Sequence, residues 1–152
     1  IDAINQSCGN GWRKVFNVYA KLLYALDNEY FDYSKCSPSW QGYRDSYLLQ
    51  DKSRTALLFS TPVLSAPVFS TPEFLARQFI QDKEVVHIIS GKGHAKALMD
   101  SGKLTVNLVW LDDEFAIDTI NKLIVCPYFD YRQLSNIKIE RLAGLLKRLI
   151  DS

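Results

Sequence analysis

Hydrophobic residues recur with helical spacing in two long segments, one near each end of the chain. Residues 10–26 carry apolar side chains three or four positions apart, which is typical of a helix with one buried face. A leucine-rich stripe of the same period predicts a last helix over residues 134–150. Two shorter helices are expected over residues 41–49 and over residues 71–80, which open on a Thr-Pro-Glu sequence suited to a helix start.

Short apolar runs between these helices predict strands. The strongest of them, residues 85–89, is rich in β-branched side chains and follows a charged turn. The other expected strands are residues 55–59, 104–110 and 123–126. A short helix is expected over residues 94–99, and residues 112–121 are interpreted as one or two helical turns.

Helices and strands alternate along the chain, which indicates an α/β fold. We predict a single domain over residues 1–152, with three layers: a mostly parallel sheet of about four strands and helices on both of its faces. Ligands of such sheets bind beyond the carboxyl ends of the strands. Three loops are therefore candidates for a site: residues 60–71, 90–94 and 126–135.

The sequences at these loops resemble motifs of one enzyme superfamily. Residues 56–62 (ALLFSTP) are similar to a strand that ends in Leu-Leu-Asn-Thr before a turn-rich loop, and residues 85–95 (VVHIISGKGHA) to a strand that enters a Trp-Gly-Ser/Lys-x-Ala turn. Residues 125–135 (VCPYFDYRQLS) stand where a His-Pro-Ser-Pro-Leu-Ser motif precedes the last helix, and residues 11–16 resemble an early Pro-Ser-Leu-x-Asn-Ile helix. In order and spacing, residues 10–150 thus resemble the uracil-DNA glycosylase superfamily.

The resemblance implies a glycosylase-like fold with altered chemistry. Ser60 stands where the family has an Asn that reads the flipped base, and Tyr128 where it has a His that stabilises the leaving uracil. A serine hydroxyl cannot give paired amide recognition, and a neutral phenol acts only as a hydrogen-bond donor. The family's water-positioning loop would precede Ile1, and because the chain lacks an initiator methionine we expect a missing N-terminal segment. We expect no catalytic residue among those present, and no cofactor or metal.

Two of the loops carry side chains suited to ligand binding. The turn at residues 91–94 offers backbone N–H groups and an ammonium for a phosphate, although an ordinary strand-to-helix turn would need the same glycines. The loop after residue 126 offers rings for stacking and a guanidinium for anions; its alternatives are a protein interface and a cover for the sheet end. The predicted ligand-binding residues are Ser60, Thr61, Gly91, Lys92, Gly93, His94, Tyr128, Asp130, Tyr131 and Arg132.

Composition narrows the classes of function. Hydrophobic residues make up 47% of the 152 residues and charged residues 23%, as in globular chains, and no apolar run approaches the roughly 20 residues that cross a membrane. The 18 Lys and Arg against 17 Asp and Glu give a net charge of +1, without the basic excess usual in nucleic-acid binders. The cysteines lack zinc spacing, and Cys36 and Cys126 are expected to be buried, reduced thiols of a cytoplasmic protein.

Three functions stay open at this point. The first is a non-catalytic or catalytically divergent glycosylase-like domain that binds a nucleotide or nucleic acid at the carboxyl ends of its strands. The second is an active base-excision glycosylase whose water-positioning loop lies upstream of residue 1. The third is a protein-interaction domain or homodimer that uses the aromatic loop 128–132. No membrane partner is expected.

Overall fold

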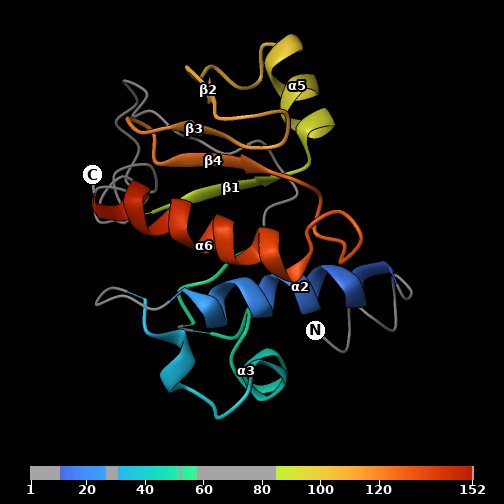
Figure 1. Ribbon diagram of the computed structural model, residues 1–152, viewed down its shortest axis with the longest axis vertical. Coiled ribbons are helices and arrows are strands. Elements are labelled where there is room, and N and C mark those ends of the chain that lie inside the picture. The colour runs from blue at the N-terminus through green and yellow to red at the C-terminus, as the bar shows by residue number, and fades with distance from the viewer. Residues whose placement is uncertain (1–10, 27–30, 52, 58–84, 152) are drawn as a thin grey trace. The chain divides into compact units, whose positions relative to one another are not determined.

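The computed structural model describes residues 11–26, 31–51, 53–57 and 85–151 (Figure 1). The chain forms two compact units, which we describe separately. The first unit comprises residues 1–57 and 127–148, and the second comprises residues 58–126 and 149–152. The predicted helix 71–80, the loop 60–71 and its candidates Ser60 and Thr61 lie outside the described residues. The single-domain organisation stays a prediction.

The first unit begins with helix α2 (Gly11–Ala25), which confirms the helix predicted from the apolar period. Its buried face is Val15, Phe16, Val18, Ala20, Leu22 and Leu23. These positions fall three or four residues apart, so burying them requires the backbone to be helical. The opposite face is polar and carries Arg13, Lys14, Asn17 and Lys21.

The short helix α3 (Trp40–Ser46) confirms the helix expected over residues 41–49. It begins where the Ser39 hydroxyl accepts a 3.1 Å hydrogen bond from the Gly42 backbone N–H, which is the usual role of a serine N-cap. It ends after two turns and buries the ring of Tyr43, which lies 5.6 Å from the ring of Tyr33 in the preceding 3-10 turn η1 (Tyr33–Lys35).

The last helix, α6 (Asn136–Asp151), confirms the helix predicted over residues 134–150. The leucine stripe falls on its buried side: Leu142, Leu146 and Leu149 are almost fully inaccessible. Ile137 at the helix start is exposed, so the apolar stripe begins only at Ile139. Residues 136–148 belong to the first unit.

The second unit holds a four-stranded sheet in the order β1-β4-β3-β2. Its strands are β1 (His87–Ser90), β2 (Val109–Trp110), β3 (Ala116–Asp118) and β4 (Leu123–Cys126). Strands β1 and β4 are parallel, whereas β4 with β3 and β3 with β2 pair antiparallel. The prediction of a mostly parallel sheet is therefore wrong for the described strands: the sheet is mixed.

Three of the expected elements differ from the structure. Residues 55–57 form no strand, and only the last two residues of the run 104–110 pair as a strand. The segment 112–121, interpreted as helical turns, contains strand β3 instead. The reason is that β3 reverses tightly into β4, so that Asp118 pairs with Leu123 and the hairpin hydrogen bonds replace local helical ones.

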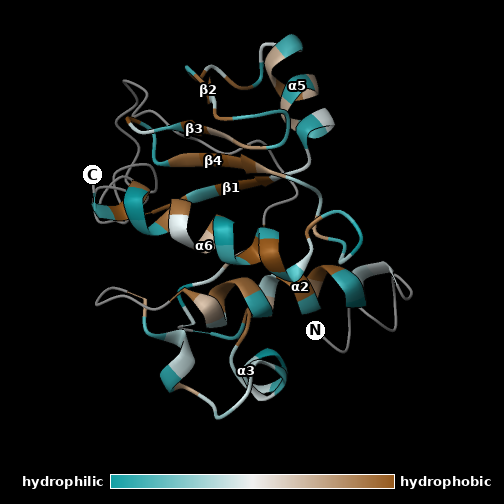
Figure 2. Ribbon diagram, in the orientation of Figure 1, coloured by the Kyte–Doolittle hydropathy of each residue, from teal (hydrophilic) through white to brown (hydrophobic). Residues whose placement is uncertain are grey.

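Helix α5 (Lys92–Asp100) packs on one face of this sheet and begins two residues earlier than predicted. Ala95 of α5 joins a core cluster that also contains Ile89, Leu104, Ala116, Leu123 and Val125. Strand β4 is buried at all four positions and is coloured hydrophobic in Figure 2. A helical layer on the other face of the sheet stays a prediction.

The turn between β3 and β4 is organised by one buried carboxylate, that of Asp118. Its Oδ1 accepts hydrogen bonds from the backbone N–H groups of Ile120 and Asn121, each at 3.0 Å. Its Oδ2 accepts from the Asn107 N–H at 3.1 Å and from Asn121 Nδ2 at 2.7 Å. Burial alone would raise the pKa of this carboxyl, but the four donors outweigh burial and hold the pKa below its ordinary value.

A matched pair of glycines tests the turn into α5. Gly91 has φ of 106°, so Gly91→Ala should lower the free energy of unfolding by about 1–3 kcal/mol. Gly93 lies inside the helix, where an added Cβ meets nothing within 4 Å, so Gly93→Ala should raise it by about 0.5–1 kcal/mol. Urea denaturation followed by circular dichroism measures both. Equal effects of the two substitutions would show that the backbone at Gly91 imposes no strain.

Candidate functional site

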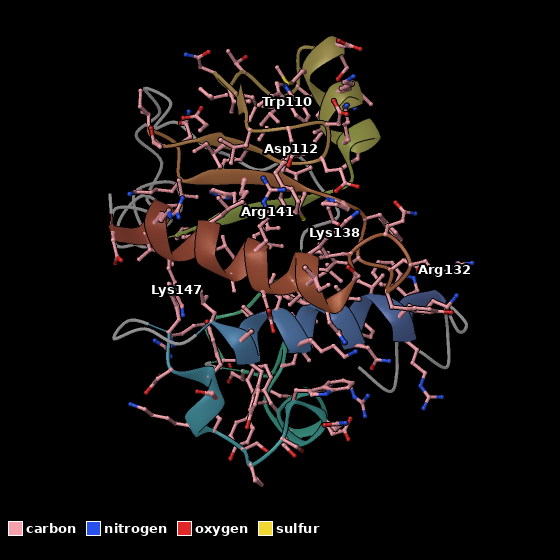
Figure 3. All side chains as sticks on the ribbon, in the orientation of Figure 1. Trp110, Asp112, Arg132, Lys138, Arg141 and Lys147 are labelled. Atoms are coloured by element: carbon pink, nitrogen blue, oxygen red, sulfur yellow. The ribbon has the colours of Figure 1, made fainter. Side chains whose placement is uncertain are left out.

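The loop at residues 128–132 is a tight turn closed by an ion pair between Asp130 and Arg132. The Asp130 N–H donates to the Tyr128 carbonyl at 2.7 Å, and the Arg132 N–H donates to Asp130 Oδ1 at 2.9 Å. The guanidinium of Arg132 donates two more hydrogen bonds to the same carboxylate, from Nη2 to Oδ2 at 2.9 Å and from Nε to Oδ1 at 3.2 Å. Arg132 itself extends from the turn that precedes α6 (Figure 3).

This pairing decides what the two charged residues can do. The guanidinium and N–H of Arg132 lower the pKa of the Asp130 carboxyl to about 2, and Asp130 in return raises the pKa of Arg132. Asp130 is thus an anion whose acceptor positions are occupied within its own turn. Asp130 therefore stabilises the turn. Because Nε and Nη2 of Arg132 bond to Asp130, the Nη1 side of the guanidinium is the part that faces away from this pairing and could meet a ligand.

The depressed pKa of Asp130 gives a pH dependence with a definite sign. Its folded pKa, about 2, lies below the unfolded value of about 3.9, so its stabilising contribution is present above about pH 4 and is lost as pH falls through 2. Carbon-13 NMR titration of the side-chain carboxyl should show the low midpoint. Arg132→Gln should raise that midpoint by about one unit. A midpoint near 4 in the parent chain would contradict the pairing.

The aromatic residues of this turn separate into a buried ring and two exposed ones. Phe129 is buried, and its ring lies 5.7 Å from that of Tyr19 on α2. Tyr128 and Tyr131 are 46% and 59% exposed. The alternative that the loop covers the core fits Phe129, whereas Tyr128 and Tyr131 are accessible to a ligand or a partner.

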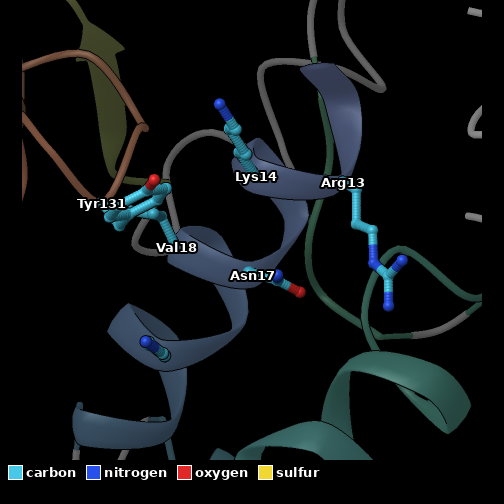
Figure 4. Close-up of a pocket in the computed structure, with 6 residues that line it drawn as sticks. Arg13, Lys14, Asn17, Val18 and Tyr131 are labelled. Carbon is cyan, nitrogen blue, oxygen red and sulfur yellow. The ribbon is translucent and has the colours of Figure 1, made fainter. Parts of the chain in front are cut away.

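Tyr131 also closes one side of a pocket on α2. The pocket has a volume of about 350 Å³ and is lined by Arg13, Lys14, Asn17, Val18, Lys21 and Tyr131. Figure 4 shows that the Tyr131 ring lies against the helix beside Val18, with Lys14 on the next turn toward the N-terminus. The Nζ atom of Lys14 lies 5.6 Å from the centre of the Tyr131 ring, a distance typical of a cation–π contact.

The electrostatics of the α2 pocket favour an anion. Its lining contains three cationic side chains and no carboxylate. Within the described residues, neither Lys14 nor Lys21 has a carboxylate oxygen within 4.0 Å. Asn17 also lines the pocket, and its Oδ1 accepts a 2.7 Å hydrogen bond from Arg44 Nη1.

Some residues of the α2 pocket were predicted from the sequence as ligand-binding residues and others were not. The aromatic turn was predicted to bind a ligand, and Tyr131 does line the pocket. The lysines of α2 were missed. The sequence shows that these lysines are seven residues apart on the polar side of a helix, which is also typical of an ordinary solvent-exposed face. The contact of Lys14 with Tyr131, which only the structure shows, distinguishes the two cases.

The second candidate turn, residues 91–94, belongs to the other unit. Because β1 and β4 are parallel, this turn leaves the same sheet edge as Cys126, and the Gly91 N–H donates to the Cys126 carbonyl at 2.8 Å. The Lys92 ammonium lies 5.1 Å from the ring centre of Trp110, and His94 is exposed at the start of α5. Phosphate binding by these residues stays a prediction.

The cysteines differ from expectation in one case. Cys126 is fully buried in β4, where burial raises the pKa of its thiol. Cys36 is exposed because it follows the short turn η1 on the surface, so its predicted burial is wrong. Among the described residues, no three His, Cys, Asp or Glu side chains are grouped so that they could hold a metal ion. In the same residues, no helix has the length and apolar character to span a bilayer.

The described part of the chain is thus an α/β protein with a cationic, partly aromatic pocket on one helix. A family model described as a family of unknown function (DUF6942) matches residues 1–147, so the chain belongs to that family. No curated protein and no solved structure matches the chain.

Proposed function

We propose that this protein binds a nucleotide or nucleic acid in the α2 pocket, without catalysing a reaction on it. The observation that carries the proposal is the lining itself: Arg13, Lys14 and Lys21 face a space with no carboxylate, beside the exposed ring of Tyr131. Cations of this kind bind phosphate oxygens, and an exposed aromatic ring offers a surface on which a base can stack.

The uracil-DNA glycosylase-like fold remains part of this proposal. The parallel pairing of β1 with β4 supports it, because the turns at Gly91 and Pro127 then leave the same edge of the sheet, as in the motifs that the sequence resembles. The antiparallel pairings of β3 depart from a mostly parallel sheet. The nucleotide-binding proposal does not depend on this likeness, because it rests on the α2 pocket.

Fluorescence anisotropy with a labelled single-stranded oligonucleotide of about 20 nucleotides tests the proposal at low salt. Tyr131→Ala should weaken binding by about 5- to 100-fold, because loss of one stacked base costs about 1–3 kcal/mol. Lys14→Gln should weaken binding and flatten its salt dependence, since each phosphate contact adds about 0.7 to the slope for single strands.

Matched controls in the same unit are Tyr47→Ala and Lys35→Gln. Tyr47 is 44% exposed and Lys35 is also exposed, and neither lines the pocket. Both control variants should bind like the parent. Equal losses in controls and test variants, or no binding by the parent at low salt, would overturn the proposed function.

A further inference from the structure

The α2 pocket has a second lysine about two helical turns from Lys14. Lys14 and Lys21 are seven residues apart, which corresponds to about 10.5 Å along the helix axis and places both lysines on one face. Asn17 lies between them on the same face, and all three residues line the pocket. The anion-binding groups therefore form a row along the helix rather than a single point.

Each end of this row pairs a lysine with an aromatic ring. At one end the Nζ of Lys14 lies 5.6 Å from the Tyr131 ring centre, and at the other the Nζ of Lys21 lies 4.9 Å from the ring centre of Trp40. Trp40 is the first residue of α3 and is partly exposed. Trp40 does not itself line the pocket, but its contact with Lys21 places a second ring next to the lining.

Arg44 fixes the geometry of the far end. Its guanidinium carbon lies 5.4 Å from the centre of the Trp40 ring, and its Nη1 donates to Asn17 Oδ1. Its Nε and Nη2 are taken by Asp45 at 2.8 and 3.2 Å. Three of the five N–H donors of Arg44 are thus used, so Arg44 is a positioning residue that holds Asn17 and Trp40 in place. Lys21 supplies the charge: its Nζ also lies 3.5 Å from Asn136 Oδ1, but within the described residues it has no carboxylate oxygen within 4.0 Å.

We infer that the ligand of the α2 pocket is a stretch of single-stranded nucleic acid that runs along α2 from Tyr131 to Trp40, and not a mononucleotide. This inference rests on the proposed function. Phosphates of one strand recur about every 3.4 Å along the axis of a duplex and lie farther apart in an unstacked strand, so a span of about 10.5 Å covers about two or three of them. A mononucleotide reaches only one lysine–aromatic pair, whereas a short strand reaches both.

The two rings also favour a single strand over a duplex. The bases of a duplex are stacked on one another, so their faces are closed to protein side chains, whereas those of a single strand are open. A duplex would meet only the lysines, and Tyr131 and Trp40 would add nothing to its affinity.

The test compares ligand lengths on the intact chain. Thymidine monophosphate, thymidine oligonucleotides of two, four and eight residues, and an eight-base-pair duplex are titrated by calorimetry. We expect affinity to rise at least tenfold from the mononucleotide to the tetranucleotide and then to level off, with the duplex weaker than the octanucleotide. Trp40→Ala should lower octanucleotide affinity by about tenfold, and Trp40→Phe should restore most of the loss. Circular dichroism confirms that each variant is folded.

The outcomes separate this inference from the proposed function. If the mononucleotide binds as tightly as the octanucleotide, or the duplex binds as tightly as the single strand, the inference is wrong and the proposed function stands. If Trp40→Ala is folded and binds the octanucleotide like the parent, the inference is likewise wrong. If no ligand in the series binds, the proposed function fails and the inference fails with it.

Discussion

Asp118→Ala should lower the free energy of unfolding by about 2–4 kcal/mol, the largest loss we expect from a single polar substitution in the described sheet. The reason is that the carboxylate accepts four hydrogen bonds in a turn where it is only 3% exposed. Removing it leaves the partly buried N–H groups of Asn107, Ile120 and Asn121 without their acceptor. Urea denaturation followed by circular dichroism measures the loss.

Asp113→Ala is the matched control, because Asp113 is an exposed aspartate in the same unit. Its effect should stay within about 0.5 kcal/mol. The sign of the pH dependence gives a second test. Because folding lowers the pKa of Asp118, its contribution is present above the unfolded pKa of about 3.9 and is lost as pH falls through the folded value. The gap between the parent and Asp118→Asn should therefore shrink on acidification, and a constant gap would contradict the assignment.

The double charge reversal Lys14→Glu with Lys21→Glu should weaken binding of a 20-nucleotide single strand by about a hundredfold or more at 50 mM salt. Each substitution removes one phosphate contact and puts a like charge in its place, which costs about 1 kcal/mol or more per site at the protein surface. Fluorescence anisotropy at several salt concentrations measures the affinity, and its salt slope should flatten as well.

A control must separate the effect of the protein's net charge from the effect of where the substituted lysines lie. Lys96→Glu with Lys103→Glu changes the net charge by the same amount, at two exposed positions of the other unit. That control should lose less than about threefold in affinity, because neither lysine lines the α2 pocket and solvent-exposed charges are screened by salt. Similar losses in both double variants would show that the lysines of α2 act only through net charge.

Helices were predicted from this sequence more accurately than strands, for a physical reason. The apolar period of α2 and α6 spans four turns or more, so each helix carries its own signal. Strand β3 has only three residues, which is too short for a strand period to stand out in the sequence. Its conformation depends on pairing with β4 and on the bonds to Asp118, which are tertiary contacts rather than local preferences.

The candidate site was predicted in part. The unusual composition of residues 128–132 pointed to Tyr131 and Arg132, but the partner of Arg132 could not be predicted, because Asp130 might equally have faced a ligand. Lys14 and Lys21 were visible as polar helix positions and were not recognised. What the sequence could not show is that Lys14 and Lys21 line one pocket and that Tyr131 and Trp40 lie beside them.

The order in which the chain is synthesised bears on how the α2 pocket is completed. Lys21 leaves the ribosome 110 residues before Tyr131, a delay of roughly 5–20 s at typical rates of translation. During that time the whole of residues 58–126 emerges, which belongs to the other unit. A nascent chain therefore exposes Lys14 and Lys21 of α2 before Tyr131, which closes one side of the pocket, has been synthesised. If the α2 pocket binds a single strand as we propose, the complete site forms only after the segment that carries Tyr131 has left the ribosome.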